Sequence, residues 1–396
     1  MAASHDSASL TVKPTVPWYR DRNARAIAFQ IVALSAVILL GWYLVSNTMH
    51  NMATRNIATG WSFLGREAGF GISEHIIEYS PADSYGRAIL VGFLNTIKVA
   101  VIGIVLATII GIIVGLGRLS PNWLVARIAT VYVEGLRNVP LLLQLIIWYG
   151  LIIAMPGPRQ AVQMMPGVFL TGRGVYYPSI ETEPVHSWMG ILFVVGIVLT
   201  WGYARWAKRR QDETGKAAPL LLPAIGFVIG LPVLAWLVSG APMALSLPEL
   251  KGFNFAGGSV LSPEFAAMLV GLSTYTGAFI AEVVRSGIQA VSHGQTEAAR
   301  ALGLRPMLVT RLVVFPQSLR VIVPPLTSQY LNLTKNSSLA VAIGYPDLVS
   351  AGNTALNQTG QAVECIAIIM GVYLAISLAI SLFMNWYNKH IALVER

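Results

Sequence analysis

The sequence predicts an all-α integral membrane protein with about eight transmembrane helices. The chain of 396 residues is 55% hydrophobic and only 11% charged, whereas ordinary soluble domains carry about 25% charged residues. Most of its apolar runs approach or exceed the roughly 20 residues that a helix needs to cross a bilayer, and polar segments separate them. The net charge of +9 does not indicate a nucleic-acid-binding protein, because the basic residues lie in loops beside apolar runs.

Eight apolar runs are predicted to span the membrane. The first is too long for the apolar core of a signal peptide, so we expect it to be retained. The seventh contains Pro324 and Pro325, which should kink it. In chain order the predicted spans cover residues 26–46, 88–117, 141–152, 189–203, 220–238, 265–286, 319–333 and 363–384.

Basic residues are distributed unevenly between the two sets of loops. Eight spans place both termini on one side, and the loops of that side hold most of the Lys and Arg, including the run from Arg205 to Lys216. Because cytoplasmic loops carry an excess of basic residues, both termini are predicted to be cytoplasmic. The segment of residues 290–316, between the sixth and seventh spans, falls on the same side.

Residues 290–316 have the pattern of two short helices in a polar loop. Residues 295–302 are good helix formers, with Glu297 near the positive end of the helix dipole. Gly303 should end this helix, because it accepts the left-handed conformation without steric cost. Pro306 is well suited to open a second short helix. We therefore predict a compact projection at the membrane surface.

This segment resembles the EAA loop of bacterial ABC importer permeases. Val313 and Phe315 stand where that family usually has Ile and Leu, and both replacements remain apolar. The resemblance implies a type I ABC importer permease core in which the loop binds a cytoplasmic ATPase, while ATP and Mg belong to that partner and not to this chain. The residues that carry the resemblance, and with it the coupling role, are Glu297, Ala298, Ala299, Gly303 and Pro316.

Four further segments resemble the polar amino-acid branch of these permeases. They are residues 92–96, 133–144, 275–285 and 335–339. The long N-terminal extension and an insertion are most similar to the general L-amino-acid permeases. The implied division of the chain is a cytoplasmic tail (1–25), an extra transmembrane helix with a periplasmic loop (26–87), the first part of the core (88–155), an insertion with two extra transmembrane helices (156–263), and the rest of the core with the EAA loop (264–390).

Polar residues at membrane depth are candidates for the substrate path. Transporters build binding sites from broken helices with polar ends, although the same residues could instead bond one helix to another. Lys98 is a candidate because an intramembrane lysine is costly, but it could also snorkel or pair with a neighbour. Asn336 is uncharged where several relatives are acidic, which argues weakly against a strictly cationic substrate. The candidates are Lys98, Gln329, Asn332, Lys335, Asn336, Ser337 and Ser338.

Two pairs of opposite charges are expected at the inner edge of the membrane. Glu134 and Arg137 are three residues apart, as are Glu282 and Arg285, so each pair can share one face of a helix. Structural ion pairs are the simplest interpretation, and a role in gating is the alternative.

Other function classes fit the sequence less well. An ion-coupled secondary amino-acid transporter, the main alternative, should show inverted repeats and acidic residues in mid-span. An intramembrane enzyme needs a catalytic group in a span, but all six histidines lie in loops or tails. The single cysteine, Cys365, offers neither a disulfide nor a metal cluster, and the sequence lacks a Walker-type phosphate loop.

The resemblance also implies the partners and the location of the chain. We expect a multi-pass protein of the bacterial inner membrane that imports L-amino acids of broad specificity. Its expected partners are a second, related permease in a heterodimer, a cytoplasmic ABC ATPase dimer and a periplasmic amino-acid-binding protein. Nucleic acid is not an expected partner.

Overall fold

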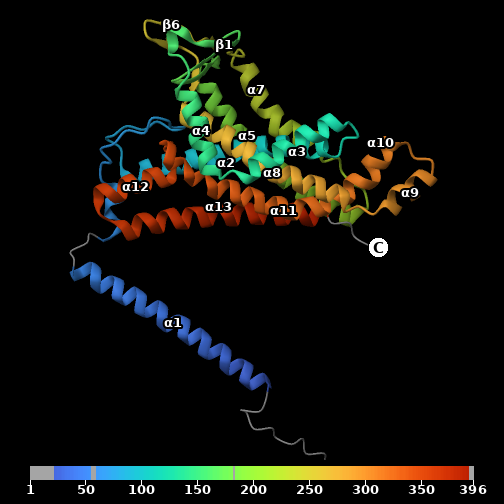
Figure 1. Ribbon diagram of the computed structural model, residues 1–396, viewed down its shortest axis with the longest axis horizontal. Helices are drawn as coiled ribbons and strands as arrows, with labels where there is room; N and C mark the ends of the chain where they lie inside the picture. The colour runs from blue at the N-terminus through green and yellow to red at the C-terminus, as the bar shows by residue number, and fades with distance from the viewer. Residues whose placement is uncertain (1–21, 55–58, 182, 392–396) are drawn as a thin grey trace, which may run out of the picture.

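The computed structural model describes residues 22–54, 59–181 and 183–391 (Figure 1). Most of the predicted cytoplasmic tail of residues 1–25 therefore lies outside the described residues. Seven helices of the described part are long and apolar enough to cross a membrane, or eight if the bent pair α3 and α4 forms one span. The molecule is thus the mostly helical, multi-pass protein that the sequence predicts.

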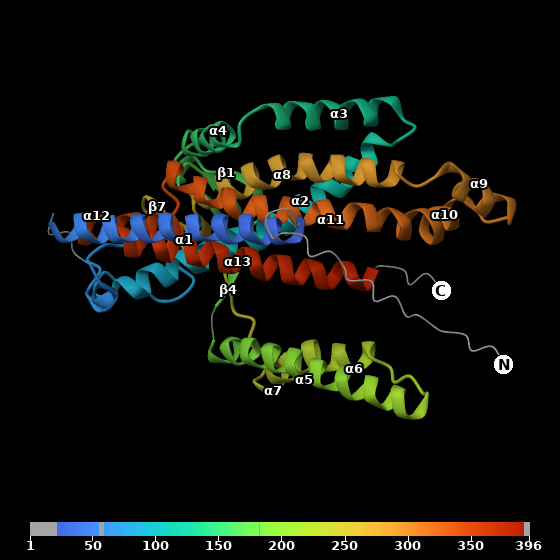
Figure 2. The ribbon, with the colours of Figure 1, turned by 90° about the horizontal axis from the view of Figure 1, so that it is seen from below.

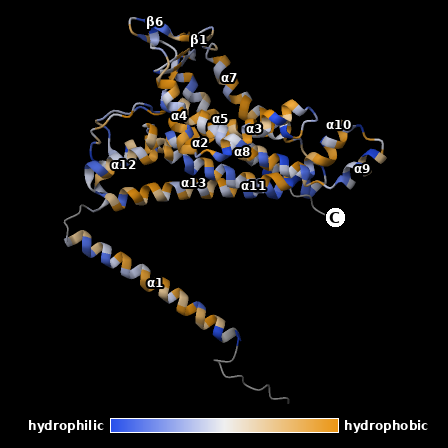
Figure 3. Ribbon diagram, viewed as in Figure 1, coloured by the Kyte–Doolittle hydropathy of each residue, from blue (hydrophilic) through white to orange (hydrophobic). Residues whose placement is uncertain are grey.

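The first helix, α1 (Arg22–Thr54), stands apart from the rest of the molecule (Figure 1). The apolar part of the helix has no residue buried against the chain. Figure 3 shows hydrophobic residues along most of its length. Because apolar side chains on all faces suit a helix in lipid, α1 fits the extra transmembrane helix that the sequence predicts.

Helix α8 lies at the centre of the core. It packs against α2, α4 and α11, and α11 packs in turn against α13. Small residues bring α2 and α8 close together: a Cβ added to Gly111 would lie 2.4 Å from Ile280 Cγ2. The core helices are α2 (Tyr85–Arg118), α3 (Trp123–Asn138), α4 (Leu141–Ile153), α8 (Pro263–Gln289), α11 (Phe315–Asn336), α12 (Leu348–Thr359) and α13 (Ala362–Ile391).

The predicted third span, residues 141–152, is only half of a bent pair. Helix α3 precedes it, and the chain turns by 105° between α3 and α4. Pro140 lies at the bend, where its missing N–H and its ring disfavour a continuous helix. Gln144 compensates, because its Nε2 donates to the carbonyls of Leu136 and Val139, each at 2.9 Å.

The predicted insertion contains a helical hairpin that packs mainly on itself. It consists of α5 (Pro184–Thr214), α6 (Leu221–Ile225), a π-helical turn η3 (Gly226–Gly230) and α7 (Leu231–Val238). The two arms cross closely at Gly196, where a Cβ would lie 2.1 Å from the carbonyl oxygen of Phe227. Figure 2 shows the hairpin beside the core. These arms contain the predicted spans 189–203 and 220–238.

The segments that flank this hairpin fold together into what we call the β cap, residues 156–180 and 241–262. The sequence predicts only loops here. The cap contains a four-stranded antiparallel sheet of order β1-β2-β3-β8 and two ribbons, β4-β5 and β6-β7. Its elements are η2 (Pro158–Gln160), β1 (Val162–Met165), β2 (Val168–Thr171), β3 (Gly174–Tyr177), β4 (Ser179–Ile180), β5 (Leu245–Ser246), β6 (Glu249–Lys251), β7 (Asn254–Ala256) and β8 (Ser259–Leu261).

The remaining short elements lie in the 59–84 segment and on either side of α11. Turn η1 (Trp61–Gly65) precedes α2. Helices α9 (His293–Ala301) and α10 (Pro306–Val309) follow α8, and a π-helical turn η4 (Thr310–Val314) joins α10 to α11. The 3₁₀ helix η5 (Ser337–Ile343) follows α11.

Helical backbone around α11 extends further than the sequence predicts. Pro306 does not open a separate short helix, because helical backbone continues from α10 through η4 into α11. The helix also runs through Pro324 and Pro325 without ending. The predicted span of residues 319–333 is therefore the middle of a longer helical segment.

Candidate functional site

The loop between α8 and α11 projects from one end of the helix bundle (Figure 1). Helix α9 matches the predicted helix of residues 295–302 closely. It ends before Gly303, whose φ of +77° is left-handed, a conformation that costs side-chain-bearing residues about 1–2 kcal/mol. Gly303 donates to the carbonyl of Arg300 at 2.9 Å. The chain therefore reverses tightly between α9 and α10.

The predicted coupling residues divide between the surface and the interior of this loop. Glu297 and Ala298 are exposed, whereas Ala299 is buried. Pro316 is the second residue of α11, directly after the π-helical turn, and such a turn accommodates the missing backbone donor. Glu297 and Ala298 are thus available to a partner, while Ala299 and Pro316 shape the loop.

Two large apolar side chains flank the turn and are almost fully exposed. Leu302 is 82% exposed and Met307 is 81% exposed. Figure 3 shows hydrophilic residues on neighbouring α9, so these two side chains lie at the edge of a polar surface. Exposed apolar groups rimmed by polar residues are typical of protein interaction sites.

Charged residues of three helices meet where α2, α3 and α8 lie together. Glu282 and Arg285 form the predicted pair, with Arg285 Nη2 2.5 Å from Glu282 Oε1. Arg118 at the end of α2 also binds Glu282. Glu134 Oε1 lies 3.8 Å from Arg118 Nη2. The ion pairs of the described residues do not include Glu134 with Arg137, so this predicted pair is wrong.

Arg137 instead covers an aromatic ring of α8. Its guanidinium carbon lies 5.0 Å from the centroid of Phe279, and the side chain is exposed. Cation–π contacts of this kind favour a guanidinium over the ring face. Arg137 therefore contacts Phe279, which lines a cavity.

That cavity has a volume of about 290 Å³ and lies between α8 and α11. Thr276 is 13 residues from each end of α8, which places it about 20 Å from either end at 1.5 Å per residue. The cavity therefore lies near the middle of this helix, and we call it the central cavity. It is lined by Tyr275, Thr276, Phe279, Gln329, Asn332 and Asn336.

Three of the predicted substrate-path residues meet in this cavity because of their spacing. Gln329, Asn332 and Asn336 recur at intervals of three and four, which places them on one face of α11. Each amide offers both hydrogen-bond donors and acceptors. Together with Arg137, the cavity can satisfy a carboxylate and an ammonium group without a fixed negative charge.

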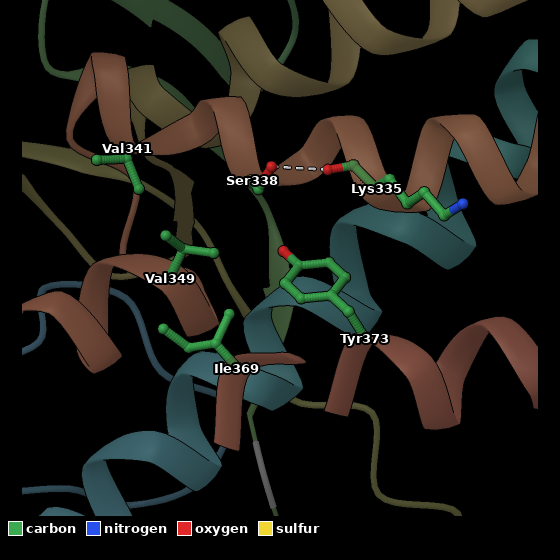
Figure 4. Close-up of a pocket in the computed structure, with 6 residues that line it drawn as sticks. All are labelled: Lys335, Ser338, Val341, Val349, Ile369 and Tyr373. Carbon is green, nitrogen blue, oxygen red and sulfur yellow. Dashed lines mark hydrogen bonds between the residues drawn. The ribbon is translucent and has the colours of Figure 1, made fainter. Parts of the chain in front are cut away.

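Lys335 and Ser338 line a different cavity, of about 360 Å³, with Tyr373 of α13 (Figure 4). Ser338 Oγ donates to the carbonyl of Lys335 at 2.8 Å, and the Lys335 ammonium points away from Val341 and Val349. Ser337 is buried and donates to the carbonyl of Thr334 at 2.7 Å. These polar groups therefore bind the backbone of the helix end or face the second cavity.

Lys98 lines neither of these two cavities and has an internal partner. Its Nζ lies 2.5 Å from Glu74 Oε1 and 4.2 Å from the centroid of the Phe265 ring. Glu74 also accepts from Ser262 Oγ at 2.6 Å, and its backbone carbonyl accepts from Asn95 Nδ2 at 2.7 Å. In this structure the charge of Lys98 is balanced by the loop before α2.

Comparison with known proteins now assigns the family. Residues 214–393 match the model of the binding-protein-dependent transport system inner membrane component. The chain is 50% identical to the general L-amino acid transport system permease protein AapQ of Rhizobium johnstonii, over 95% of this chain and 94% of that protein. It belongs to the amino-acid ABC transporter permeases.

Two further relatives extend over almost the whole chain. The putative amino-acid ABC transporter permease protein YhdX of Escherichia coli is 50% identical over 98% of both chains. The glutamate/glutamine/aspartate/asparagine transport system permease protein BztB of Rhodobacter capsulatus is 42% identical over 95% of this chain and 96% of its own length. The predicted family is therefore confirmed, and the permease is a multi-pass transport component of the inner membrane and not an enzyme.

Several residues of the candidate site are not evident from the sequence. Tyr275, Thr276 and Phe279 of α8 line the central cavity, but only the packing of α8 on α11 reveals that they face Asn332. The partner of Arg137 was predicted wrongly, because a spacing of three residues was taken as sufficient for an ion pair with Glu134. Glu74 gave no signal, since an acidic residue in a polar loop is ordinary.

Proposed function

We propose that this permease imports L-amino acids of broad specificity, driven by ATP hydrolysis on a partner ATPase. The names of AapQ and BztB refer to general L-amino acids and to both acidic and amide amino acids. The central cavity supports the same range, because its amide groups can reorient to donate or accept. The positive charge of Arg137, which lies over the ring of the lining residue Phe279, suits the carboxylate that all amino acids share.

The observation that carries the coupling role is the exposed surface of the loop between α8 and α11. Glu297 and Ala298 on α9 and the apolar Leu302 and Met307 beside the turn all face solvent. The left-handed Gly303 fixes the angle at which these residues are presented. A groove on a cytoplasmic ATPase could therefore bury the apolar groups and pair with Glu297.

Mechanism follows from thermodynamic coupling. Closure of the ATPase pair around ATP moves the α9 loop with its groove, and the helix bundle alternates between inward-facing and outward-facing forms. The continuous helical segment from α10 through α11 connects the loop to Asn332 in the central cavity. The two nucleotide states must differ in affinity for the two bundle forms, since this difference supplies the coupling free energy.

The proposed assembly contains two permease chains, two ATPases and a periplasmic amino-acid-binding protein. A heterodimer of related permeases is the proposed pairing, and ATP and Mg would be held by the ATPases. Both termini of this chain and the α9 loop would lie in the cytoplasm, because basic residues concentrate in those loops.

The coupling role predicts the behaviour of two variants. Glu297→Lys reverses the charge on the exposed face of α9, and Gly303→Asp strains the turn, so each should abolish uptake while the protein remains inserted. Uptake of radiolabelled L-glutamate and L-glutamine should fall to background in cells that express normal amounts of permease and ATPase.

Matched controls exist on other parts of the chain. Glu213→Lys makes the same charge reversal at another exposed position. Gly360→Asp places the same residue at a helix end with a φ of +72° and open space around it, as at Gly303. Both controls should retain uptake, and normal uptake by either loop variant would refute the coupling role.

A further inference from the structure

The β cap brings two arginines and a phenylalanine from separate segments into one pocket. Arg159 lies in η2, Arg173 lies in the turn between β2 and β3, and Phe253 lies between β6 and β7. The pocket has a volume of about 260 Å³ and is lined by Gly157, Pro158, Arg159, Gln160, Arg173 and Phe253. None of these positions is part of the central cavity or the α9 loop.

Backbone contacts hold the two guanidinium groups in place. The guanidinium carbon of Arg159 lies 3.8 Å from the centroid of the Phe253 ring, and Arg159 Nε donates to the carbonyl of Gly252 at 3.4 Å. Arg173 Nη1 donates to the carbonyl of Phe253 at 3.4 Å. Each guanidinium has five N–H donors in total, so most remain available to a ligand.

The scaffold beneath the pocket is built to be rigid. The ring of Phe255, two residues after Phe253, lies 4.7 Å from that of Phe169 and 4.8 Å from that of Tyr176. The hydroxyl of Tyr176 also donates to Asn254 Oδ1 at 2.9 Å. Gly172 is pressed against the end of α4, where a Cβ would lie 2.7 Å from the carbonyl oxygen of Met155. A preorganised surface loses little entropy on binding.

The charge of this pocket is not balanced within the described chain. The ion pairs formed by the described residues involve Arg87, Lys98, Arg118 and Arg285, and none involves Arg159 or Arg173. Two adjacent cations without a carboxylate should attract an acidic partner.

Exposed apolar side chains accompany the two cations. Phe253 is 70% exposed, and Met164 and Met165 on the edge strand β1 are 62% and 59% exposed. Arg, Met and aromatic residues are the types enriched at protein–protein interfaces. A polar, charged surface of this kind fits a transient complex, whereas the interfaces of permanent complexes are more apolar.

We propose that the β cap is the docking surface for the extracytoplasmic amino-acid-binding protein, with Arg159 and Arg173 binding acidic side chains on its rim and Phe253 inserted between them. This inference rests on the proposed function, which supplies such a partner and places the cap outside the cell. It gives the insertion of residues 156–263 a role in recognising the binding protein, separate from the translocation path.

The test uses the complete transporter in nanodiscs and the purified amino-acid-binding protein that stimulates its ATPase. The double variant Arg159→Glu/Arg173→Glu should weaken binding of that protein about tenfold or more, while the basal ATPase rate stays unchanged. Wild-type binding should weaken as salt rises, because salt screens exposed charges, and the double variant should lose this dependence. Phe253→Ala should weaken binding without changing its salt dependence.

Arg66→Glu is the matched control, since it makes the same charge reversal at an exposed position in the loop before α2, outside the β cap. It should leave binding within about twofold of wild type, as expected for a charge outside the contact. Wild-type affinity in the double variant would overturn the docking proposal alone. Dissociation of the two permease chains in the double variant would overturn it in favour of a permease–permease contact. Failure of any binding protein to stimulate the wild-type complex would overturn the proposed function as well.

Discussion

Arg118 lies between two carboxylates that belong to different helices. It ends α2 and contacts both Glu282 of α8 and Glu134 of α3. The two contacts are unequal, because the side chain of Glu282 is 27% exposed and also binds Arg285, whereas that of Glu134 is 59% exposed. Glu282 is therefore the carboxylate on which this cluster depends.

Removing these two carboxylates should have very different effects. Glu282→Ala leaves two mostly buried arginines without a counter-charge and should lower the free energy of unfolding by about 2 kcal/mol. Glu134→Ala should change it by less than about 0.5 kcal/mol, as for other exposed pairs. Thermal unfolding of the two purified variants in one detergent measures the difference, and equal losses would contradict this account.

Asp347 is a buried carboxyl group at the start of α12. Its Oδ1 accepts from the backbone N–H of Ser350 at 2.8 Å, and its Oδ2 lies 3.4 Å from the hydroxyl of Tyr373. Burial raises the pKa of Asp347 to about 7. Between about pH 4 and pH 7 the folded protein therefore keeps this carboxyl group protonated, whereas in the unfolded chain the group is ionised.

The raised pKa predicts that stability falls as pH increases. This contribution is fully present below about pH 4 and is lost as pH rises through about 7. Asp347→Asn keeps an acceptor at the helix start but cannot ionise. The unfolding temperature of the wild type should therefore fall more steeply than that of Asp347→Asn between about pH 4 and pH 7. Parallel curves would show that the group is not responsible.

Some site residues could be predicted from the sequence and others could not. Gln329, Asn332 and Asn336 stand out because they are polar in an apolar helix and share a face. Their neighbour Phe279 does not stand out, because its role depends on how α8 is rotated against α11. Lys98 stands out in the same way, but its partner Glu74 comes from a loop whose position only the folded chain defines.

Helices α2 and α8 are held together by close backbone approach. Gly111 and Gly115 are four residues apart on α2, and a Cβ at either would meet α8 at 2.8 Å or less. Small residues at such spacing allow helices in membranes to pack closely. This contact fixes the helix that carries Tyr275, Thr276 and Phe279.

Enlarging Gly111 should separate the two helices. Gly111→Ala places a methyl group 2.4 Å from Ile280 Cγ2, so it should lower stability by about 1–3 kcal/mol as an overpacked site. Gly135→Ala, in α3, is the control, because its Cβ would meet nothing within 4 Å. In unfolding measurements in detergent, Gly111→Ala should be less stable than Gly135→Ala. A stability of Gly111→Ala equal to that of the wild type would argue against tight packing.

At the level of elements, the apolar runs predicted which segments form spans better than they predicted where each helix begins and ends. Helix α11 continues through two prolines and a π-helical turn, which propensity alone would treat as breaks. The strands were missed although the two-residue turn Gly172-Arg173 between β2 and β3 is a hairpin signal. Pairing of β3 with β8 joins segments about 80 residues apart, and no local pattern indicates it.

The proposed orientation of the whole molecule is based on its charges. Lys216, in the turn between the arms of the hairpin, should face the cytoplasm, whereas Lys251, in the β cap, should face outward. Both positions are exposed.

Cysteine labelling can test this orientation directly. A membrane-impermeant maleimide should label Lys251→Cys in intact cells, but Lys216→Cys only after the inner membrane is permeabilised. The wild type is the control, because its single thiol, Cys365, is buried and should not react. The opposite labelling pattern would invert the proposed topology.

The pairing of β3 with β8 has a consequence for the ancestry of the chain. Tyr177 lies opposite Ser259, so the polypeptide leaves and rejoins this sheet at neighbouring points, with α5 to α7 threaded in between. Such a module can be gained or lost as a block without rerouting the central helices. A shortened gene that joins these strands by a tight turn should therefore still encode a properly assembled bundle.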